Sequence, residues 1–445
     1  MWGINQLSAI IGRHAFGKML ARDGAIALTI KVSNACLQFG LQILLARLLG
    51  ATEFGAYMFA IAWVNILLIA GKLGFESTAL RYTSSYKVLK DWGRLFGFMR
   101  SALFLVLSSS ILVAIIFAIS SLIWGQYLTH SQHIALVAAL VLVPILSIMQ
   151  VQGAILRGLG GIFRSLMPFS IIRHMLLILL LCVGYLYGVE ITALDAQIFT
   201  VVSGFLSMIL IFYWFREERK IVSLKMEVNS QPTYEIRTWL TASLPMMVVG
   251  GFQVILGQSD IIVVNMLVGS EAGGVYAAMS QLSLLMLLGY ASVNAVVAPT
   301  IAKLHTVGKH QELQSLVTLI SRLGFGITLL VGVFLMLLGE WIIGFYGSEF
   351  EVGYPILVAL VIAQLIGAMA GSVSYVLAMT DHQNYLLIAT GVSALFNLLL
   401  NILLVPIYGA MAAAYVTVMT ITGLHVALVY FAHKKIGIRS SIFGL

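Results

Sequence analysis

The sequence predicts an all-α integral membrane protein with twelve transmembrane helices arranged as two parallel six-helix repeats. Composition, recurring apolar stretches and an internal duplication support this fold class. Of the 445 residues, 60% are hydrophobic and 9% are charged, whereas roughly a quarter would be charged in a soluble protein. Apolar stretches of about 20 residues recur along the whole chain, and this length crosses a bilayer core of ~30 Å.

The duplication is visible when the chain is shifted along itself. A shift of 219 residues places Leu48-Leu49-Gly50 on Leu267-Val268-Gly269, and Gly55-Ala56-Tyr57 on Gly274-Val275-Tyr276. Each copy contains six predicted helices, an even number, so both copies begin on the same side of the membrane and the repeats are parallel. Such a duplicated unit is typical of a transporter built from two halves around a central path.

The apolar stretches define the elements in order. They predict helices at 25–49, 56–80, 98–124, 133–156, 165–187, 191–215, 239–268, 275–302, 315–343, 353–379, 385–407 and 410–432. The predicted domains are an amphipathic segment on the cytoplasmic face (1–24), a first lobe (25–215), a cytoplasmic linker (216–238), a second lobe (239–432) and a cytoplasmic tail (433–445).

Lys and Arg are distributed asymmetrically between the connections. Alternate connections contain neither residue, namely those near 50–55, 125–132, 188–190, 269–274, 344–352 and 408–409. The segments on the other side, among them 81–97, 216–238 and both ends of the chain, are rich in Lys and Arg. The positive-inside rule therefore places the N and C termini in the cytoplasm. The net charge of +8 reflects this topology, and we expect no nucleic-acid partner.

Polar residues form a stripe on each of the first two predicted helices. At 100° per residue, the members of each stripe fall within ~40° of one another. The stripes comprise Lys31, Gln38 and Gln42 on the first helix, and Asn65, Lys72 and Glu76 on the second. Because lipid-facing charges are costly, we expect a shared wet surface that binds the substrate. The alternative is that these residues form hydrogen bonds and a Lys72–Glu76 pair that hold the helices together.

Three cations of the first lobe lie at similar predicted depth. At 1.5 Å per residue, Lys31 lies ~9 Å, and Lys72 and Arg173 ~12 Å, from the cytoplasmic ends of their helices. The aligned residues of the second copy are Gly250 and Ala291 at the shift of 219, and Ala394 at the shift of 221 that fits the later part of the repeat. A cationic patch open to the cytoplasm suits an anionic substrate such as a phosphate or pyrophosphate. Alternatively, Arg173 pairs with a helix-end carbonyl or with Asp195.

Asp260 is the only acid well inside the predicted second lobe. An intramembrane carboxylate is a candidate site for a coupling ion, with H⁺ and Na⁺ as the candidates. Alternatively, Asp260 forms hydrogen bonds within the bundle, for example with Asn294. Asn397 and Asn401 either line the same cavity or hold helices together. Arg47 lies near a helix end, where snorkelling to the interface is expected.

The sequence contains no Walker motif, no zinc-ligand spacing and no nucleophile elbow. We therefore expect no cofactor, no metal site and no enzymatic activity. The outward connections are all shorter than about ten residues, which disfavours a membrane polymerase or ligase with an outward catalytic loop.

Segment 41–57, which reads LQILLARLLGATEFGAY, resembles the start of the polysaccharide biosynthesis (Wzx-type, O-antigen or oligosaccharide) flippases. Segment 259–276, SDIIVVNMLVGSEAGGVY, resembles the corresponding turn of their second half. These flippases belong to the multidrug/oligosaccharidyl-lipid/polysaccharide (MOP) exporter superfamily, together with MATE-type multidrug exporters and lipid II flippases.

The resemblance implies a flippase of the bacterial inner membrane. Its substrate would be an undecaprenyl-pyrophosphate-linked oligosaccharide, moved from the cytoplasmic to the periplasmic leaflet by alternating access for assembly of a surface polysaccharide such as the O-antigen of lipopolysaccharide. The implied partners are this lipid-linked oligosaccharide, membrane lipids and a polysaccharide polymerase.

Two other classes of function are compatible with the architecture. A MATE-type, cation-coupled exporter of drugs or metabolites would carry acids in its cavity, whereas the first lobe here is basic. A non-transporting scaffold or glycosyltransferase would keep Gln38, Asn65 and Lys72 away from water.

Overall fold

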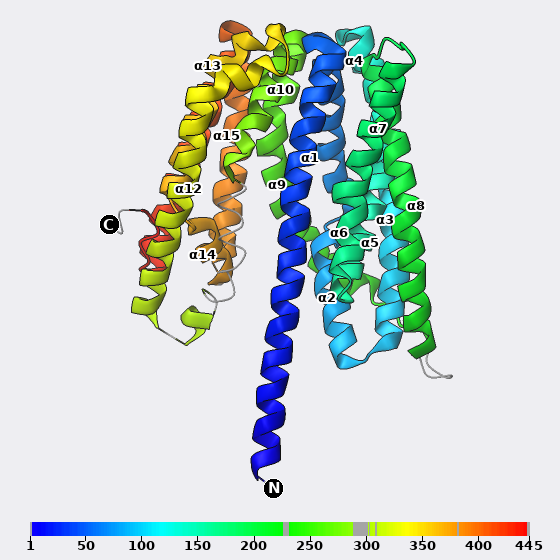
Figure 1. Cartoon of the computed structure of the whole chain (residues 1–445), viewed down its shortest axis with the longest axis vertical. Helices are drawn as coiled ribbons and strands as arrows, with labels where there is room; N and C mark the ends of the chain where they lie inside the picture. The colour runs from blue at the N-terminus through cyan, green and yellow to red at the C-terminus, as the bar shows by residue number, and fades with distance from the viewer. Residues whose placement is uncertain are drawn as a thin grey trace.

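The computed structural model describes residues 2–225, 231–287, 301, 303–307, 309–380 and 382–442. Every regular element within these residues is a helix (Figure 1). Ten helical segments of the described chain are long and apolar enough to cross a membrane. The first of them, Thr29–Lys72, has 44 residues and contains a break at Gly50. The chain is thus a multi-pass, all-helical membrane protein.

The helices form two lobes that lie side by side, with α1, α9 and α10 between them (Figure 1). The first lobe contains α1 (Trp2–Lys72), α2 (Phe75–Leu89), α3 (Trp92–Trp124), η1 (Gly125–Tyr127), α4 (His130–Ala139), α5 (Leu142–Gly158), α6 (Ile162–Met167), the π-helical turn η2 (Pro168–Ile172), α7 (Arg173–Leu186) and α8 (Ala193–Lys225). The second contains α9 (Ile236–Leu267), α10 (Ser270–Leu284), α12 (His310–Gly344), η3 (Ser348–Gly353), α13 (Tyr354–Met369), α14 (Val373–Met379), α15 (Gln383–Tyr408) and α16 (Ala410–Ile436).

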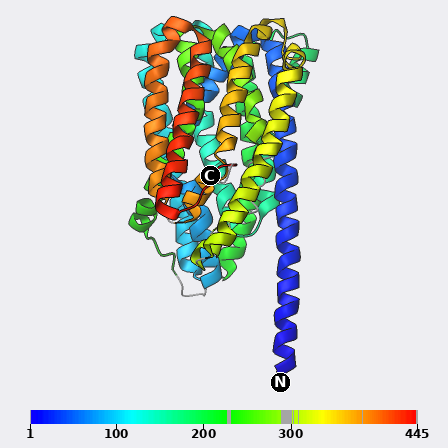
Figure 2. The same cartoon turned by 90° about the vertical axis from the view of Figure 1, so that its left-hand side faces the viewer.

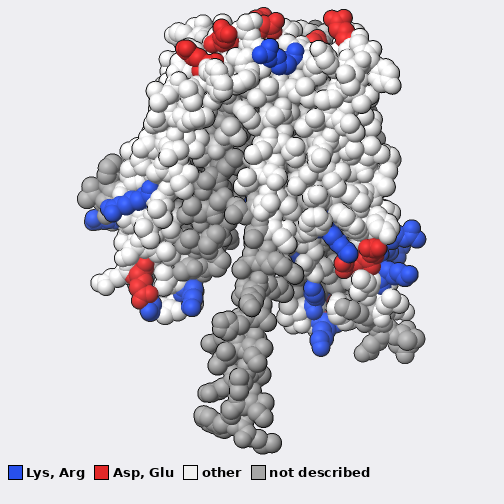
Figure 3. All heavy atoms as spheres, viewed as in Figure 1, with Lys and Arg blue, Asp and Glu red and all other residues white. Residues whose placement is uncertain are grey.

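The two ends of the bundle differ in charge. Asp and Glu gather at the end that holds η3, and most of the visible Lys and Arg lie towards the opposite end (Figure 3). We call the end with Gly50, Gly269 and η3 the acidic end. The opposite end, where α2 meets α3 and α8 leads into the linker, is the basic end.

Several predicted helices are interrupted. The predicted helix 56–80 ends at Lys72 and resumes as α2, because Gly74 adopts a left-handed conformation with φ 74°. The predicted helix 353–379 is divided into α13 and α14 around Gly371, which has φ 67°. Pro168 opens the π-helical turn within the predicted helix 165–187, since proline lacks the N–H of a regular helical bond.

Three further boundaries differ from the prediction. Predicted segment 1–24 is helical from Trp2 and continuous with the first span, so the backbone forms one helix up to Gly50. Predicted helix 133–156 is divided into α4 and α5. Predicted helix 275–302 begins as α10, and most of its second half lies outside the described residues.

Two glycines related by the repeat turn the chain at the acidic end. Gly50 has φ 68° and ψ 174° between the two parts of α1. Gly269 has φ 125° and ψ 169° between α9 and α10. Only glycine adopts such angles without steric cost, so in each lobe the first helix turns into the second at a single residue. A glycine with positive φ and extended ψ thus occurs at the same place in both repeats, in agreement with the duplication that the sequence predicts.

Hydrogen bonds join the lobes at the acidic end. The Arg47 guanidinium donates to the carbonyls of Gly344 (2.8 Å) and Phe345 (2.7 Å), which lie at the end of α12. In the opposite sense, the Glu349 carboxylate accepts from the backbone N–H of Ala51 at 2.7 Å. Arg47 is exposed as expected for a snorkelling side chain, but it also satisfies carbonyls that a helix end leaves unpaired.

Helix α9 packs on both lobes. Near the basic end, Trp239 donates a hydrogen bond from Nε1 to the Tyr86 hydroxyl (3.1 Å) and packs edge-on against Phe98, with ring centroids 5.2 Å apart. A Cβ added to Gly74 would lie 2.1 Å from the carbonyl oxygen of Ser243. Towards the acidic end, Ser259 donates to Asn397 of α15 at 2.9 Å. The beginning of the predicted second lobe therefore contacts the first lobe.

Candidate functional site

The polar stripe of Lys31, Gln38 and Gln42, together with the neighbouring Asn34 of α1, includes side-chain atoms without hydrogen-bond partners. Asn34 and Gln42 are half-buried, and the side-chain oxygen of each is buried and unbonded. Lys31 and Gln38 lie on the same helix and are exposed. Buried polar atoms are normally bonded to protein or water, so this surface retains acceptors for a ligand or for solvent.

Arg173 is a cation that touches no carboxylate in the described part of the chain. The π-helical turn places it at the start of α7, with the guanidinium carbon 4.9 Å from the centre of the Phe169 ring. Its terminal nitrogen lies 3.1 Å from Nε2 of His174, whose Nδ1 lies 2.8 Å from the Ser170 carbonyl. If Nδ1 donates to that carbonyl, Nε2 accepts from Arg173.

The expected alternative partner of Arg173 is bonded elsewhere. Asp195 accepts from the backbone N–H (3.0 Å) and hydroxyl (2.7 Å) of Thr192 at the start of α8. Nε of Arg173 is buried and has no hydrogen-bond partner. The guanidinium is therefore not paired with Asp195, and its hydrogen bonds within the described chain leave N–H groups without an acceptor.

Lys72 and Glu76 form an ion pair across the break between α1 and α2. Their charged atoms are 2.8 Å apart, and Lys72 also donates to Gln150 of α5 at 2.6 Å. Arg157 lies 3.9 Å from Glu76. The lysine is in the last turn of α1 and the glutamate in the first turn of α2, the positions that helix dipoles favour.

This cluster borders the interface between the lobes. It lines a small cavity of about 110 Å³ whose other wall is α9, including Met246 and Gly250. Asn65, two turns before Lys72, donates to Gln258 of α9 at 3.4 Å. The pairing alternative thus holds for Lys72 and Glu76, and the same residues also face the space between the lobes.

Asp260 is the centre of a buried hydrogen-bond network. Its carboxylate accepts from the hydroxyls of Tyr276 (2.8 Å) and Thr417 (2.6 Å) and from the Asn401 amide (2.7 Å). Asn397 joins the network through Asn401, 3.2 Å away. The side-chain oxygen of Asn401 has no hydrogen-bond partner. The expected alternative of hydrogen bonding is therefore observed, although its suggested partner Asn294 lies outside the described residues.

The first lobe contains the same tyrosine without the acid. Tyr57, which the 219-residue shift places on Tyr276, contacts the Thr200 hydroxyl at 3.0 Å. The position aligned with Asp260 is Leu41, which is buried. A tyrosine–threonine pair thus occurs in both lobes, and only the second lobe adds a carboxylate and two asparagines.

Sequence reasoning missed several members of these clusters. Gln150 and Arg157 come from α5 and meet Lys72 and Glu76 only through tertiary packing. Gln258 meets Asn65 in the same way. Tyr276 could have been identified from the sequence, because the repeat aligns it with Tyr57 and it lies sixteen residues after Asp260.

The comparisons with known proteins concern most of the chain. A family profile described as polysaccharide biosynthesis protein matches residues 20–305. A search of curated proteins finds no match.

Solved structures of MOP-superfamily transporters share the fold. An inward-facing multidrug resistance MATE family transporter has a TM-score of 0.71 at 16% identity, covering 93% of this chain and 98% of its own. The lipid II flippase MurJ in an inward closed conformation has a TM-score of 0.69 at 16% identity, covering 91% and 87%. An outward-facing MATE family transporter has a TM-score of 0.61 at 16% identity, covering 94% and 96%.

Proposed function

The chain belongs to the polysaccharide biosynthesis protein family, and from this premise we propose that it flips a lipid-linked oligosaccharide. The substrate is an undecaprenyl-pyrophosphate-linked unit, carried from the cytoplasmic to the periplasmic leaflet of a bacterial inner membrane for polymerisation into a surface polysaccharide. The observation that carries this proposal is Arg173, a half-buried cation of the first lobe whose guanidinium contacts His174 and Phe169 but no carboxylate in the described chain.

The proposed topology has twelve spans. Dividing Thr29–Lys72 at Gly50 and counting the helix that begins at Ser270 raises the ten described spans to twelve. The distribution of Lys and Arg supports a cytoplasmic basic end and a periplasmic acidic end. Both termini then lie in the cytoplasm.

The state of the protein in this structure is proposed to be inward. Arg47 and Glu349 join the lobes at the acidic end. The TM-score is higher for the inward-facing MATE transporter, 0.71, than for the outward-facing one, 0.61. Alternating access would then require these contacts to break as the basic end closes.

Substrate capture is proposed to use the basic groups of the first lobe. A pyrophosphate needs several hydrogen-bond donors and positive charges. Arg173 supplies a planar fork of donors, and Lys31 is exposed on α1 near the basic end. Lys72 is bonded to Glu76 and Gln150, so an arriving phosphate would compete with the glutamate for it.

Asp260 is proposed to bind the coupling cation. A carboxylate with hydroxyl oxygens beside it suits a hard cation such as Na⁺, and a buried carboxylate can also carry a proton. The unbonded side-chain oxygen of Asn401 supports the sodium alternative. The two repeats differ in their charged residues. This difference supports binding of the substrate by the first lobe and binding of the cation by the second.

A deletion strain tests the function, and point variants test the site. We expect the strain to accumulate lipid-linked saccharide and to lack surface polysaccharide. Restoration by the wild-type gene should be lost with Arg173→Gln and with Lys72→Gln, at unchanged protein level. Arg164→Gln is the matched control, because Arg164 forms a half-exposed ion pair with Glu218 and such pairs contribute little.

The outcomes separate the two proposals. Drug sensitivity of the deletion strain with normal polysaccharide would contradict the flippase and favour a MATE-type exporter. Loss of polysaccharide in the deletion strain, but full activity of Arg173→Gln, would retain the flippase and reject the substrate site.

A further inference from the structure

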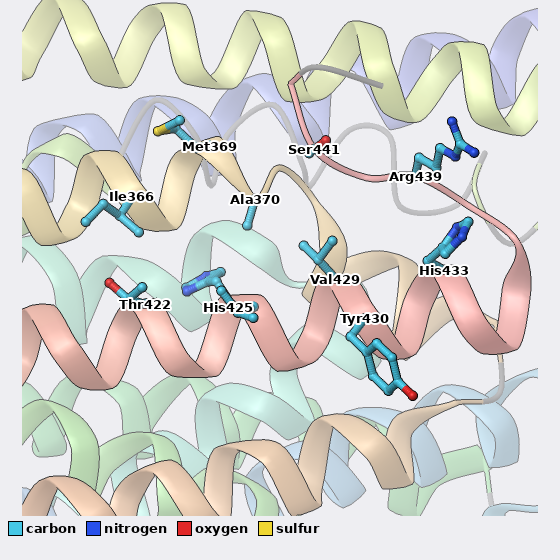
Figure 4. A pocket seen from close by; sticks show the side chains of 11 residues that line it. Ile366, Met369, Ala370, Thr422, His425, Val429, Tyr430, His433, Arg439 and Ser441 are labelled. Carbon is cyan, nitrogen blue, oxygen red and sulfur yellow. The ribbon is translucent and has the colours of Figure 1, made fainter. Parts of the chain in front are cut away.

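A cavity of about 710 Å³ lies between α13, α16 and the C-terminal segment 437–442 (Figure 4). Its volume is in the range of small-molecule sites. The cavity lies on the side of the second lobe that points away from the first lobe, because α16 and the C-terminal end face the viewer in Figure 2. Of its lining residues, Val426 is 64% exposed and Tyr430 55% exposed, so the cavity opens outward towards lipid.

The part of the cavity furthest from the basic end suits a hydrocarbon. Its two polar residues form hydrogen bonds to their own helix: Thr422 donates to the Val418 carbonyl at 2.7 Å, and Nδ1 of His425 lies 2.9 Å from the Ile421 carbonyl. The remaining walls are aliphatic or thioether side chains, contributed by Ile366, Met369, Ala370, Val426 and Val429.

The part nearest the basic end is positively charged. Arg439 and His433 lie close together there (Figure 4). Gln314 binds the backbone of Arg439 twice: its side-chain oxygen accepts from the Arg439 N–H at 2.8 Å, and its amide nitrogen donates to the Arg439 carbonyl at 2.7 Å. The guanidinium itself has no bonding partner within the described chain. Lys434 adds a second charge beside the cavity, 3.0 Å from the Tyr430 hydroxyl.

The cavity is as deep as one leaflet. From Thr422 to His433 the chain rises ~16 Å along α16, about half of a bilayer core of ~30 Å. The charged end coincides with the end of α16, which terminates at Ile436. An amphiphile with its headgroup at the basic end and one chain pointing to the bilayer centre matches this gradient.

We propose that this cavity binds one anionic phospholipid from the leaflet at the basic end. The Arg439 guanidinium binds the phosphate and headgroup, Lys434 adds positive charge, His433 offers a ring nitrogen for a hydrogen bond, and one acyl chain fills the apolar part. Basic side chains at the cytoplasmic surface attract anionic lipids. The occupant is a resident membrane lipid, so the site is independent of the transported substrate.

A second groove provides a matched control. It has a volume of about 440 Å³ between α3, α5 and α8, and its lining residues include Leu107, Met208 and Phe212 but no Lys, Arg or His. This groove accepts an acyl chain without selecting a headgroup. Selectivity for anionic lipid should therefore be confined to the cavity at α16.

Native mass spectrometry of the full-length, detergent-purified protein tests the site. The probes are phosphatidylglycerol and phosphatidylcholine with identical acyl chains. We expect preferential retention of one phosphatidylglycerol. Arg439→Gln should reduce this preference about fivefold, the effect of one basic residue near an anionic surface, and leave phosphatidylcholine binding unchanged.

Two tryptophan variants separate the cavity from nonspecific lipid contact. Val426→Trp should block the cavity and abolish the selective binding, and Leu107→Trp in the control groove should not. Both replaced residues are exposed aliphatic side chains, so neither change should prevent folding. Equal retention of the two lipids by the wild type, an unchanged preference in Arg439→Gln, or equal losses in the two tryptophan variants would overturn the proposal.

Discussion

Gly55 and Gly274 are in direct contact, although 219 residues separate them. A Cβ added to Gly274 would lie 2.9 Å from the backbone nitrogen of Gly55 and 2.1 Å from the carbonyl oxygen of Ala51. A Cβ on Gly55 would lie 1.8 Å from the carbonyl oxygen of Ser270. Repeat-related positions therefore meet between the lobes. Because the two backbones are in direct contact there, this pair of glycines keeps the acidic end closed.

Gly274→Ala should open the acidic end, because the added methyl group overlaps backbone atoms that have no room to move. A cysteine replacing Ala51, which is fully buried, should then react with a membrane-impermeant maleimide added from the acidic side. Cys36 and Cys182 are exposed and must first be replaced by serine. Gly326→Ala is the control, since nothing lies within 4 Å of its added Cβ. Continued protection of the cysteine in Gly274→Ala would contradict the closure.

Arg47→Gln should weaken the same closure, since it removes both bonds to the Gly344 and Phe345 carbonyls. We expect a stability loss of about 1 kcal/mol and faster maleimide labelling at position 51. Arg47→Lys should give an intermediate rate, because a lysine has no planar fork to bond two carbonyls at once. Equal labelling of all three proteins would show that Arg47 does not join the lobes.

Tyr276→Phe should impair the response to the coupling cation, whereas Tyr57→Phe should not. Each change removes one hydroxyl from repeat-related positions, but only Tyr276 contacts Asp260. Asp260→Asn keeps the shape of the side chain and should abolish the dependence of transport on Na⁺ or on a pH gradient, whichever drives it. The measurement is flipping in proteoliposomes with each gradient applied separately. Identical behaviour of the two tyrosine variants would remove the basis for a cation site in the second lobe.

Trp239→Phe should loosen α9 from the first lobe. The indole donates to Tyr86 and packs on Phe98, so the phenylalanine loses one hydrogen bond, worth about 1 kcal/mol, and some packing. We expect earlier loss of the monodisperse peak when the protein is heated before size-exclusion chromatography. Trp341→Phe, at a residue 65% exposed on α12, should leave the peak unchanged. A larger effect at position 341 would refute the role given to Trp239.

The features that the sequence predicts are those carried by local periodicity and by the repeat. The helical spans, the turns at Gly50 and Gly269, and the choice of Arg173 and Asp260 follow from such patterns. The partners of these residues do not, because Gln150 and Asn401 reach them from distant helices. The contacts of α9 with both lobes could not be predicted from the sequence either, since they depend on which helices Trp239 meets in the folded protein.

The turns at Gly50 and Gly269 also determine how little of the chain is accessible at the acidic end. In the proposed topology the acidic end lies in the periplasm, and the first and second helices of each lobe are joined there by one residue. Proteases and antibodies would then find no extended loop at these points. An epitope tag inserted after Gly50 or Gly269 would force the joined helices apart. A tag is better placed between α8 and α9, at the basic end. In the proposed topology it would be detectable only after the membrane is permeabilised.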